Sequence, residues 1–98
     1  MLNQFVLVGR IKKILFYENI IVVAVTRTTK DDGVYMSDNL EIKIPTNIMN
    51  NIEGNCHVET MVGIKGVIRE STVGNIELVA EKITYLGGKT DDEKGGED

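Results

Sequence analysis

The sequence predicts an all-β domain, a small barrel of five strands with one short helix between the third and fourth strands. Val and Ile are abundant and gather in short runs, which favours strands over helices. Turn-forming residues such as Gly, Asn and Asp separate these runs. The 98 residues are too few to bury two separate cores, so we expect a single domain.

The first expected strand covers residues 1–11 and is apolar on both faces. Val6 and Val8 point to one face, because successive side chains of a strand alternate. The opposite face presents Phe5, Leu7, Gly9 and Ile11. A strand with two apolar faces is covered twice, either inside a barrel or by another subunit. We expect the following residues, 12–19, to form a turn region.

The second and third strands are expected at residues 20–28 and 35–44, joined as a long hairpin. The cluster Lys-Asp-Asp-Gly that ends at Gly33 is typical of a turn. Apolar and charged residues alternate before Pro45, which ends the third strand because proline cannot donate to the ladder.

A helix of about two turns follows, with Thr46 as its expected N-cap and Gly54 as its C-terminal stop. The fourth strand is expected at residues 57–69 and the fifth at residues 76–86. Two glycines inside the fourth strand predict bulges or sharp bends, namely Gly63 and Gly66.

This element order is that of the OB-fold, a five-stranded Greek-key barrel. We expect the OB-fold domain to cover residues 1–88 and residues 89–98 to form an acidic, disordered tail. Residues 91–98 hold five acidic residues and one lysine, so the rest of the chain carries ten charges of each sign. A neutral body does not favour tight binding to phosphates, which proteins neutralise with Lys and Arg.

Three segments resemble the bacterial single-stranded DNA-binding proteins. The first is MLNQFVLVGR at residues 1–10, the second IKGVIR at residues 64–69, and the third TYLGG at residues 84–88. The resemblance implies an OB-fold that coats single-stranded DNA during replication, recombination or repair. It also implies a homo-oligomer, a tetramer or a dimer, in which the first strand pairs with its copy and covers Val6 and Val8.

The resemblance implies aromatic residues on the DNA-facing surface, on which bases would stack, and the sequence departs from the family at several of these positions. The matching positions of the third strand hold Asn39 and Pro45, and residues 70–72, directly after Arg69, include no ring. The tail also lacks the Pro-Phe tip through which the family docks partner enzymes.

Seven basic residues and one ring are the candidate DNA contacts. The basic residues would neutralise phosphates irrespective of sequence. They are Arg10, Lys12, Arg27, Lys30, Lys43, Lys65 and Arg69. The alternative is that they are ordinary solvated charges on outward strand positions. Tyr35, on the long hairpin, is the candidate stacking ring, and cross-strand packing is its alternative role.

The other aromatic and acidic residues receive structural interpretations. We expect Phe16 or Tyr17 to plug one end of the barrel, and we expect Phe5 and Tyr85 to lie in the core or an interface. The carboxylates Glu77 and Glu81 are interpreted as solvated charges.

No catalytic, metal or cofactor site is expected. The pair Cys56-His57 has no second Cys or His, whereas zinc sites need about four ligands. A nucleophilic site would also need a base and an orienting group beside the thiol. The longest apolar run, residues 20–25, is far shorter than the about 20 residues of a membrane span. We therefore expect a cytoplasmic protein without a signal peptide.

Two functions of different classes remain open, and the first is favoured. The first is sequence-tolerant binding of single-stranded DNA by an oligomeric OB-fold. The second is an OB-fold protein-interaction subunit of a replication or mobile-element complex, with weak or no DNA binding. An enzyme is a third possibility with little support, because no set of residues has catalytic spacing.

Overall fold

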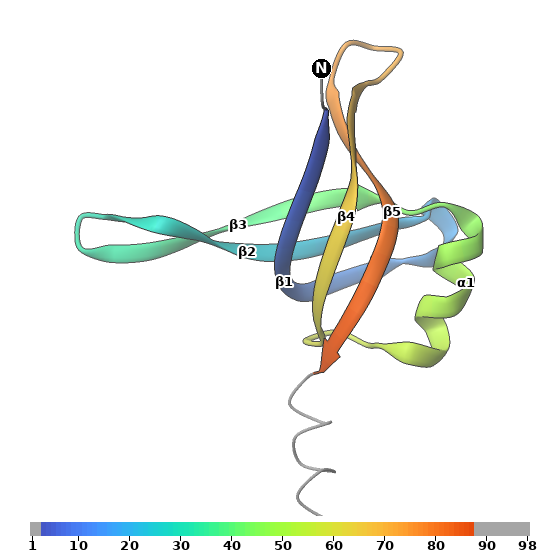
Figure 1. The fold of residues 1–98 in the computed structure, drawn as a ribbon, viewed down its shortest axis with the longest axis horizontal. Helices are drawn as coiled ribbons and strands as arrows, with labels where there is room; N and C mark the ends of the chain where they lie inside the picture. The colour runs from blue at the N-terminus through green and yellow to red at the C-terminus, as the bar shows by residue number, and fades with distance from the viewer. Residues whose placement is uncertain (1–2, 88–98) are drawn as a thin grey trace, which may run out of the picture.

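A computed structural model describes residues 3–87 as a closed barrel with one helix at its end (Figure 1). The elements are β1 (Gln4–Leu15), the 3-10 turn η1 (Phe16–Glu18), β2 (Ile20–Asp31), β3 (Val34–Lys43), α1 (Thr46–Asn55), β4 (Met61–Glu70) and β5 (Ile76–Gly87). The expected order of five strands and one helix is confirmed. The expected tail, residues 89–98, lies outside the described residues.

The strands close the barrel in the order β1-β2-β3-β5-β4. All pairs are antiparallel except β3 and β5, which run parallel. β1 serves both sides of the barrel, since its residues 4–10 pair with β4 and its residues 10–15 pair with β2. This is the predicted OB-fold, in which one bent strand belongs to two sides of a small barrel.

The core follows from the alternation of side chains along the strands. The buried apolar residues are Ile11, Ile21, Val23, Ile42, Ile44, Met49, Ile52, Val62, Ile64 and Ala80. Phe5 and Tyr85 pack against this core, as expected. On the other face of β1, Val6 and Val8 are 76% and 52% exposed, so the predicted two apolar faces are confirmed.

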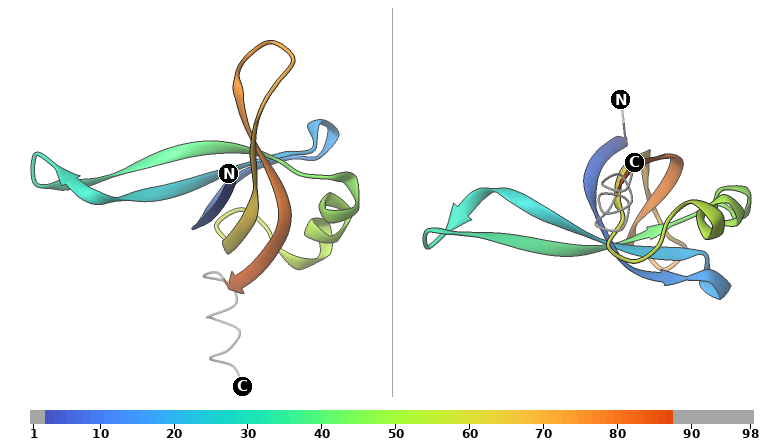
Figure 2. Two further views of the ribbon diagram at one scale, coloured as in Figure 1. Left: turned by 45° about the horizontal axis from the view of Figure 1, so that its top comes forward. Right: turned by 90° about the horizontal axis from the view of Figure 1, so that it is seen from below.

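The β2–β3 hairpin extends well beyond the barrel as a two-stranded arm (Figures 1 and 2). Its turn consists of Asp32 and Gly33, both with positive φ, 53° and 80°. Such a two-residue turn matches the right-handed twist of the flanking strands, and Asp-Gly is a preferred pair for it. The turn predicted at Gly33 is therefore confirmed.

Gly66 is required by the close approach of β4 to β5. A Cβ at this position would lie 2.0 Å from the carbonyl oxygen of Val79, and the register of the two strands shifts beside it. The bulge predicted at Gly66 is confirmed. At Gly63 a Cβ would meet no atom closer than 3.8 Å, so side-chain space does not require glycine there.

Some predicted boundaries are wrong. β1 runs on to Leu15, because residues 13–15 pair with β2 instead of forming a turn. β4 begins at Met61 and not at residue 57, because the His57 N–H donates to Thr60 Oγ1 and the Thr60 N–H donates to the His57 carbonyl. These two bonds, each 3.0 Å long, close a turn around the buried Thr60.

The expected ends of the helix are also wrong. Pro45 is the N-cap and provides no side-chain hydrogen bond, while the Thr46 hydroxyl instead accepts one from Asn19 at 3.3 Å. The helix continues past Gly54 to Asn55, and the Cys56 N–H donates to the Ile52 carbonyl.

Candidate nucleic-acid interface

Two shallow hollows lie along the outer face of the β2–β3 pair, one lined by Ala24, Thr26 and Ser37 and the other by Ile20, Glu41 and Lys43. The first, here called the β1 hollow, measures about 300 Å³. It is lined by Val8, Gly9, Arg10, Lys12, Ala24, Thr26, Ser37 and Met61. Two of the predicted phosphate contacts, Arg10 and Lys12, are therefore brought together.

The second hollow, here called the β4–β5 groove, measures about 410 Å³. It is lined by Ile20, Glu41, Lys43, Ser71, Thr72, Val73, Asn75, Ile76, Glu77 and Leu78. A neighbouring hollow of about 320 Å³ shares several of these residues and adds Arg69. The predicted contacts Lys43 and Arg69 thus lie beside each other at this end of the barrel.

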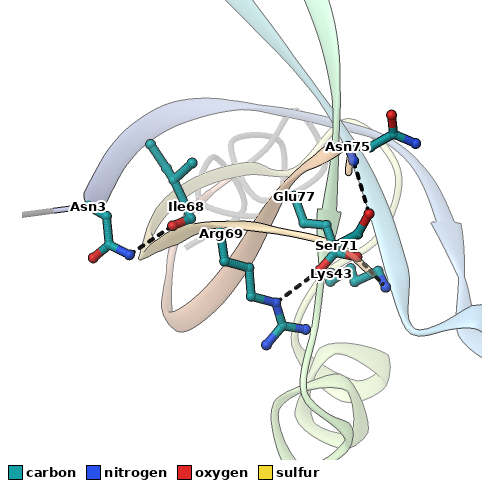
Figure 3. A network of polar contacts seen from close by, with 7 residues as sticks. All are labelled: Asn3, Lys43, Ile68, Arg69, Ser71, Asn75 and Glu77. Atoms are coloured by element: carbon teal, nitrogen blue, oxygen red, sulfur yellow. Dashed lines mark hydrogen bonds and ion pairs between the residues drawn. The ribbon is translucent and has the colours of Figure 1, made fainter. Parts of the chain in front are cut away.

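Hydrogen bonds order the β4–β5 loop that forms one wall of the groove. The Ser71 N–H donates to the Asn75 carbonyl at 2.7 Å, and the Asn75 N–H donates to Ser71 Oγ at 3.1 Å. At the base of the same hairpin, the Asn3 side chain donates to the Ile68 carbonyl at 2.9 Å (Figure 3). These bonds link the two ends of the loop to each other and the base of the hairpin to the start of β1.

Lys43 and Arg69 converge on one carboxylate, that of Glu77 (Figure 3). Lys43 Nζ lies 2.9 Å from Glu77 Oε2, and Arg69 Nε lies 2.9 Å from Glu77 Oε1. Hydrogen bonds from Lys43 first and Arg69 second hold the pKa of the Glu77 carboxyl below its usual value of 4.5. The interpretation of Glu77 as a solvated charge is wrong, because its side chain is only 14% exposed and bridges two cations.

The two cations of the β1 hollow contact the turn before β4. Lys12 Nζ lies 2.9 Å from Glu59 Oε2, and Arg10 Nη1 donates to the Glu59 carbonyl at 3.1 Å. Glu59 sits in the turn that the sequence assigned to a strand. This acidic partner was missed for that reason.

At the base of the hairpin arm, Arg27 and Asp38 form a two-pronged pair. Arg27 Nε and Nη2 lie 3.0 and 2.9 Å from the two carboxylate oxygens of Asp38. The Arg27 hydrogen bond lowers the pKa of Asp38 from its usual 3.8. Arg27 therefore fastens the two strands of the arm together, a role for which bidentate geometry is well suited.

Near the tip of the arm, Lys30 and Tyr35 face each other across the hairpin. Lys30 Nζ lies 5.1 Å from the centre of the Tyr35 ring, within the range of a cation–π contact. The ring is 56% exposed, so it packs against its cross-strand neighbour and also presents a surface to solvent. Both roles considered for Tyr35 are compatible with this position.

Lys65 lies away from both hollows. Its strand register pairs it with Val6 on β1 and with Lys82 on β5. It therefore belongs to the outer surface of β1, β4 and β5, beside the exposed apolar residues of β1.

Phe16 and Tyr17 do not plug the barrel, contrary to expectation. Phe16 is 43% exposed and Tyr17 fully exposed, at the β1–β2 connection. The reason is that Met49 and Ile52 from α1 already fill the buried positions at the helix end of the core.

The remaining potential ligands and nucleophiles of the described residues are dispersed. No three His, Cys, Asp or Glu side chains gather there as potential ligands of a metal ion. Cys56 is half-buried, and burial raises the pKa of its thiol, which disfavours the reactive thiolate. Within residues 3–87, no helix is long and apolar enough to cross a membrane.

Comparison with known proteins adds structural relatives but no sequence relatives. No family model matches the sequence, and no curated protein matches it. The mitochondrial single-stranded DNA-binding protein Rim1 of S. cerevisiae superposes with a TM-score of 0.72 at 14% identity, covering 90% of this chain and 98% of that one. The chain has the OB-fold of single-stranded DNA-binding proteins.

Two further OB-folds of this kind come from distant organisms. A Plasmodium falciparum SSB in complex with ssDNA matches with a TM-score of 0.65 at 18% identity, covering 88% of this chain and 96% of that one. The small single-stranded DNA-binding protein of Streptomyces coelicolor matches with a TM-score of 0.61 at 16% identity, covering 84% and 91%. The fold predicted from the resemblance is thereby confirmed.

Proposed function

We propose that this chain binds single-stranded DNA with little sequence preference, as an oligomer, in DNA replication, recombination or repair. The β4–β5 groove carries the proposal. OB-folds take oligonucleotides over the face of their second and third strands, between the first and last loops of the barrel. The groove lies at that place, and structures similar to this chain are those of single-stranded DNA-binding proteins.

The proposed mechanism divides the work between charged and apolar side chains. Lys and Arg side chains around the two hollows neutralise phosphates and release the counterions bound to them. Ile20, Val73 and Ile76 line the β4–β5 groove and offer apolar contacts to bases. Tyr35 adds a stacking surface on the arm, which every base can use because every base has a flat face.

The affinity is expected to be modest. Four of the candidate cations already contact carboxylates, namely Lys12, Arg27, Lys43 and Arg69. Phosphates must compete with these internal partners, so the net gain from each contact is reduced.

Titration of the full chain with an oligo-dT of a few tens of nucleotides tests the proposal. We expect saturable binding at low salt that weakens at moderate salt, with a slope of about 0.7 per neutralised phosphate. The absence of binding even at low salt would refute single-stranded DNA as the ligand.

The oligomer is proposed from the first half of β1. Its residues 4–9 pair with β4 on one edge only, because pairing with β2 begins at Arg10. The same stretch exposes Val6 and Val8. A second copy that pairs along this edge satisfies the free backbone groups and covers the apolar side chains. Light scattering that gives the mass of one chain would contradict this part of the proposal.

The paired charges favour one alternative function, a protein-interaction subunit with weak or no DNA binding. Under this alternative the ion pairs stabilise the barrel and the exposed surface contacts a replication or mobile-element protein. A pull-down that recovers such a protein from nuclease-treated extract, together with no oligo-dT binding, would support the alternative.

A further inference from the structure

Glu77 lies where the C-terminal ends of β3 and β4 meet the N-terminal end of β5. It comes from β5, and it contacts Lys43 at the end of β3 and Arg69 near the end of β4. Its side chain is 14% exposed, whereas those of Lys43 and Arg69 are 51% and 56% exposed. The carboxylate is thus held beneath two cations whose outer surfaces face solvent.

A carboxylate in this position offers the cations what a phosphate offers. Both anions present oxygen acceptors to the donors of Lys and Arg, and such charge-assisted bonds are among the stronger ones in proteins. Each Glu77 oxygen already holds one cation at 2.9 Å. The cluster of two cations and one anion keeps a net charge of +1. The charge of Glu77 therefore offsets one of the two positive charges that would otherwise attract a phosphate.

We propose that Glu77 occupies from within the chain the place of a backbone phosphate on Lys43 and Arg69, and thereby limits the affinity of the β4–β5 groove for polynucleotide. The inference rests on the proposed function and deepens it by naming one residue that limits the affinity of the groove. DNA that enters the groove must displace the carboxylate or share the cations with it.

If the proposal holds, the contribution of Lys43 to DNA affinity depends on whether Glu77 is present. In the natural chain, loss of Lys43 leaves Arg69 and Glu77 as a neutral pair. Without Glu77, the same loss removes a cation that is fully available to phosphate. Lys43 therefore matters more when Glu77 is absent, and a double-mutant cycle measures this coupling.

The test compares the oligo-dT affinities of the full chain and its Glu77→Gln variant across a salt series. We expect Glu77→Gln to bind oligo-dT about 3- to 10-fold tighter at low salt. The slope of log affinity against log salt concentration should be steeper by about 0.7, the value for one additional neutralised phosphate. Glu81→Gln is the matched control, because Glu81 is an exposed carboxylate on the same strand outside the groove. It is expected to change the affinity less than twofold.

Lys43→Gln in both backgrounds provides the second measurement. We expect Lys43→Gln to lower the oligo-dT affinity of the natural chain less than about threefold. In the Glu77→Gln variant, the same substitution should lower the affinity by a factor at least twice as large. The proposal is overturned if Glu77→Gln gains no more than Glu81→Gln, or if Lys43→Gln costs the same in both backgrounds. A natural chain that binds no oligo-dT at all would instead refute the proposed function, so the two failures are distinguishable.

Discussion

The outer surfaces at the two ends of β4 have opposite chemistry. Beside the first half of β1, Val6, Val8 and Leu86 are all more than half exposed. Val8 and Leu86 both flank Gly63, since a Cβ there would lie within 4 Å of each. At the other end of β4, Arg69 reaches the ion-paired groove. One strand thus carries an apolar surface suited to protein and a charged surface suited to a polyanion.

The comparison shows that a neutral body need not have an uncharged surface. Lys43 and Arg69 share the carboxylate of Glu77, and Arg27 pairs with Asp38, so each of these three cations lies beside an acidic group. The apolar surface formed by Val6, Val8 and Leu86 is exposed in the single chain, and the second copy proposed above would cover it. If both proposals hold, competition with internal carboxylates limits binding at the charged surface, and assembly limits it at the apolar surface.

The largest expected effect is from Gly66→Ala, which breaks both surfaces at once. The new methyl group meets the Val79 carbonyl at 2.0 Å, so the β4–β5 pairing must shift and the barrel loosens. We expect a loss of about 4 kcal/mol or more, measured by denaturant unfolding. Gly63→Ala on the same strand is the control and is expected to cost less than about 1 kcal/mol, because its Cβ meets only ordinary contacts. Equal stabilities of the two variants would contradict the assigned close approach.

Val6→Glu places a charge on the apolar surface and leaves the charged groove unchanged, so it tests the two surfaces separately. A carboxylate there lies opposite Lys65, so the folded chain tolerates it, whereas the interface between copies must bury a charge. We expect a dimer interface weakened by about 3 kcal/mol and a shift toward single chains in light scattering. Val73→Glu, on an equally exposed residue of the β4–β5 loop, is the control and should leave the mass unchanged. A similar mass change in both variants would count against the β1 interface.

Tyr35→Ala tests whether the arm contributes to the DNA-binding surface. Base–aromatic stacking contributes about 1–3 kcal/mol per base, and we expect the lower part of that range for a ring that is also engaged by Lys30. Oligo-dT affinity should therefore fall about tenfold. Tyr35→Phe keeps the ring and should bind like the natural chain. Unchanged binding by Tyr35→Ala would restrict the interface to the barrel.

The smallest expected effect is a pH dependence of stability at the base of the arm. The folded pKa of Asp38 is lowered by Arg27, so the pair stabilises the fold above pH 3.8 and this contribution is lost as the pH falls through the lowered pKa. We therefore measure the melting temperature Tm between pH 5 and pH 2. The Tm should fall less steeply with decreasing pH for Asp38→Asn than for the natural chain. Parallel curves would show that the pair contributes nothing measurable.

The sequence was sufficient for features that depend on local patterns. The two apolar faces of β1 and the turn at Gly33 follow from period-two alternation and from turn chemistry, both readable within a few residues. The bulge at Gly66 followed from a glycine inside an apolar run. These features fixed the element order, and the order fixed the fold.

The charge pairing was not predicted, although part of its signal was present. Arg69 and Glu77 are placed opposite each other by the β4–β5 hairpin, so the register across that turn gave a usable indication. Lys43 reaches Glu77 only because β3 runs parallel beside β5 when the barrel closes. That contact joins residues far apart in the chain, and no local pattern contains it.

Phe16 and Tyr17 illustrate the same limit in the core. Their apolar character predicted burial, but the positions they were expected to fill are taken by α1. Competition between distant segments for one site is decided by the whole packing, which short patterns do not describe.

The most direct test of the central claim is competition for a bound, labelled oligo-dT at low salt. Unlabelled single-stranded DNA and duplex DNA of the same length are added to the full chain in parallel. A groove shaped for an unpaired strand predicts displacement by single-stranded DNA at concentrations at least about tenfold lower than by duplex, because only unpaired bases reach its apolar wall. Equal displacement by the two would contradict the account, since it would show attraction to phosphates alone.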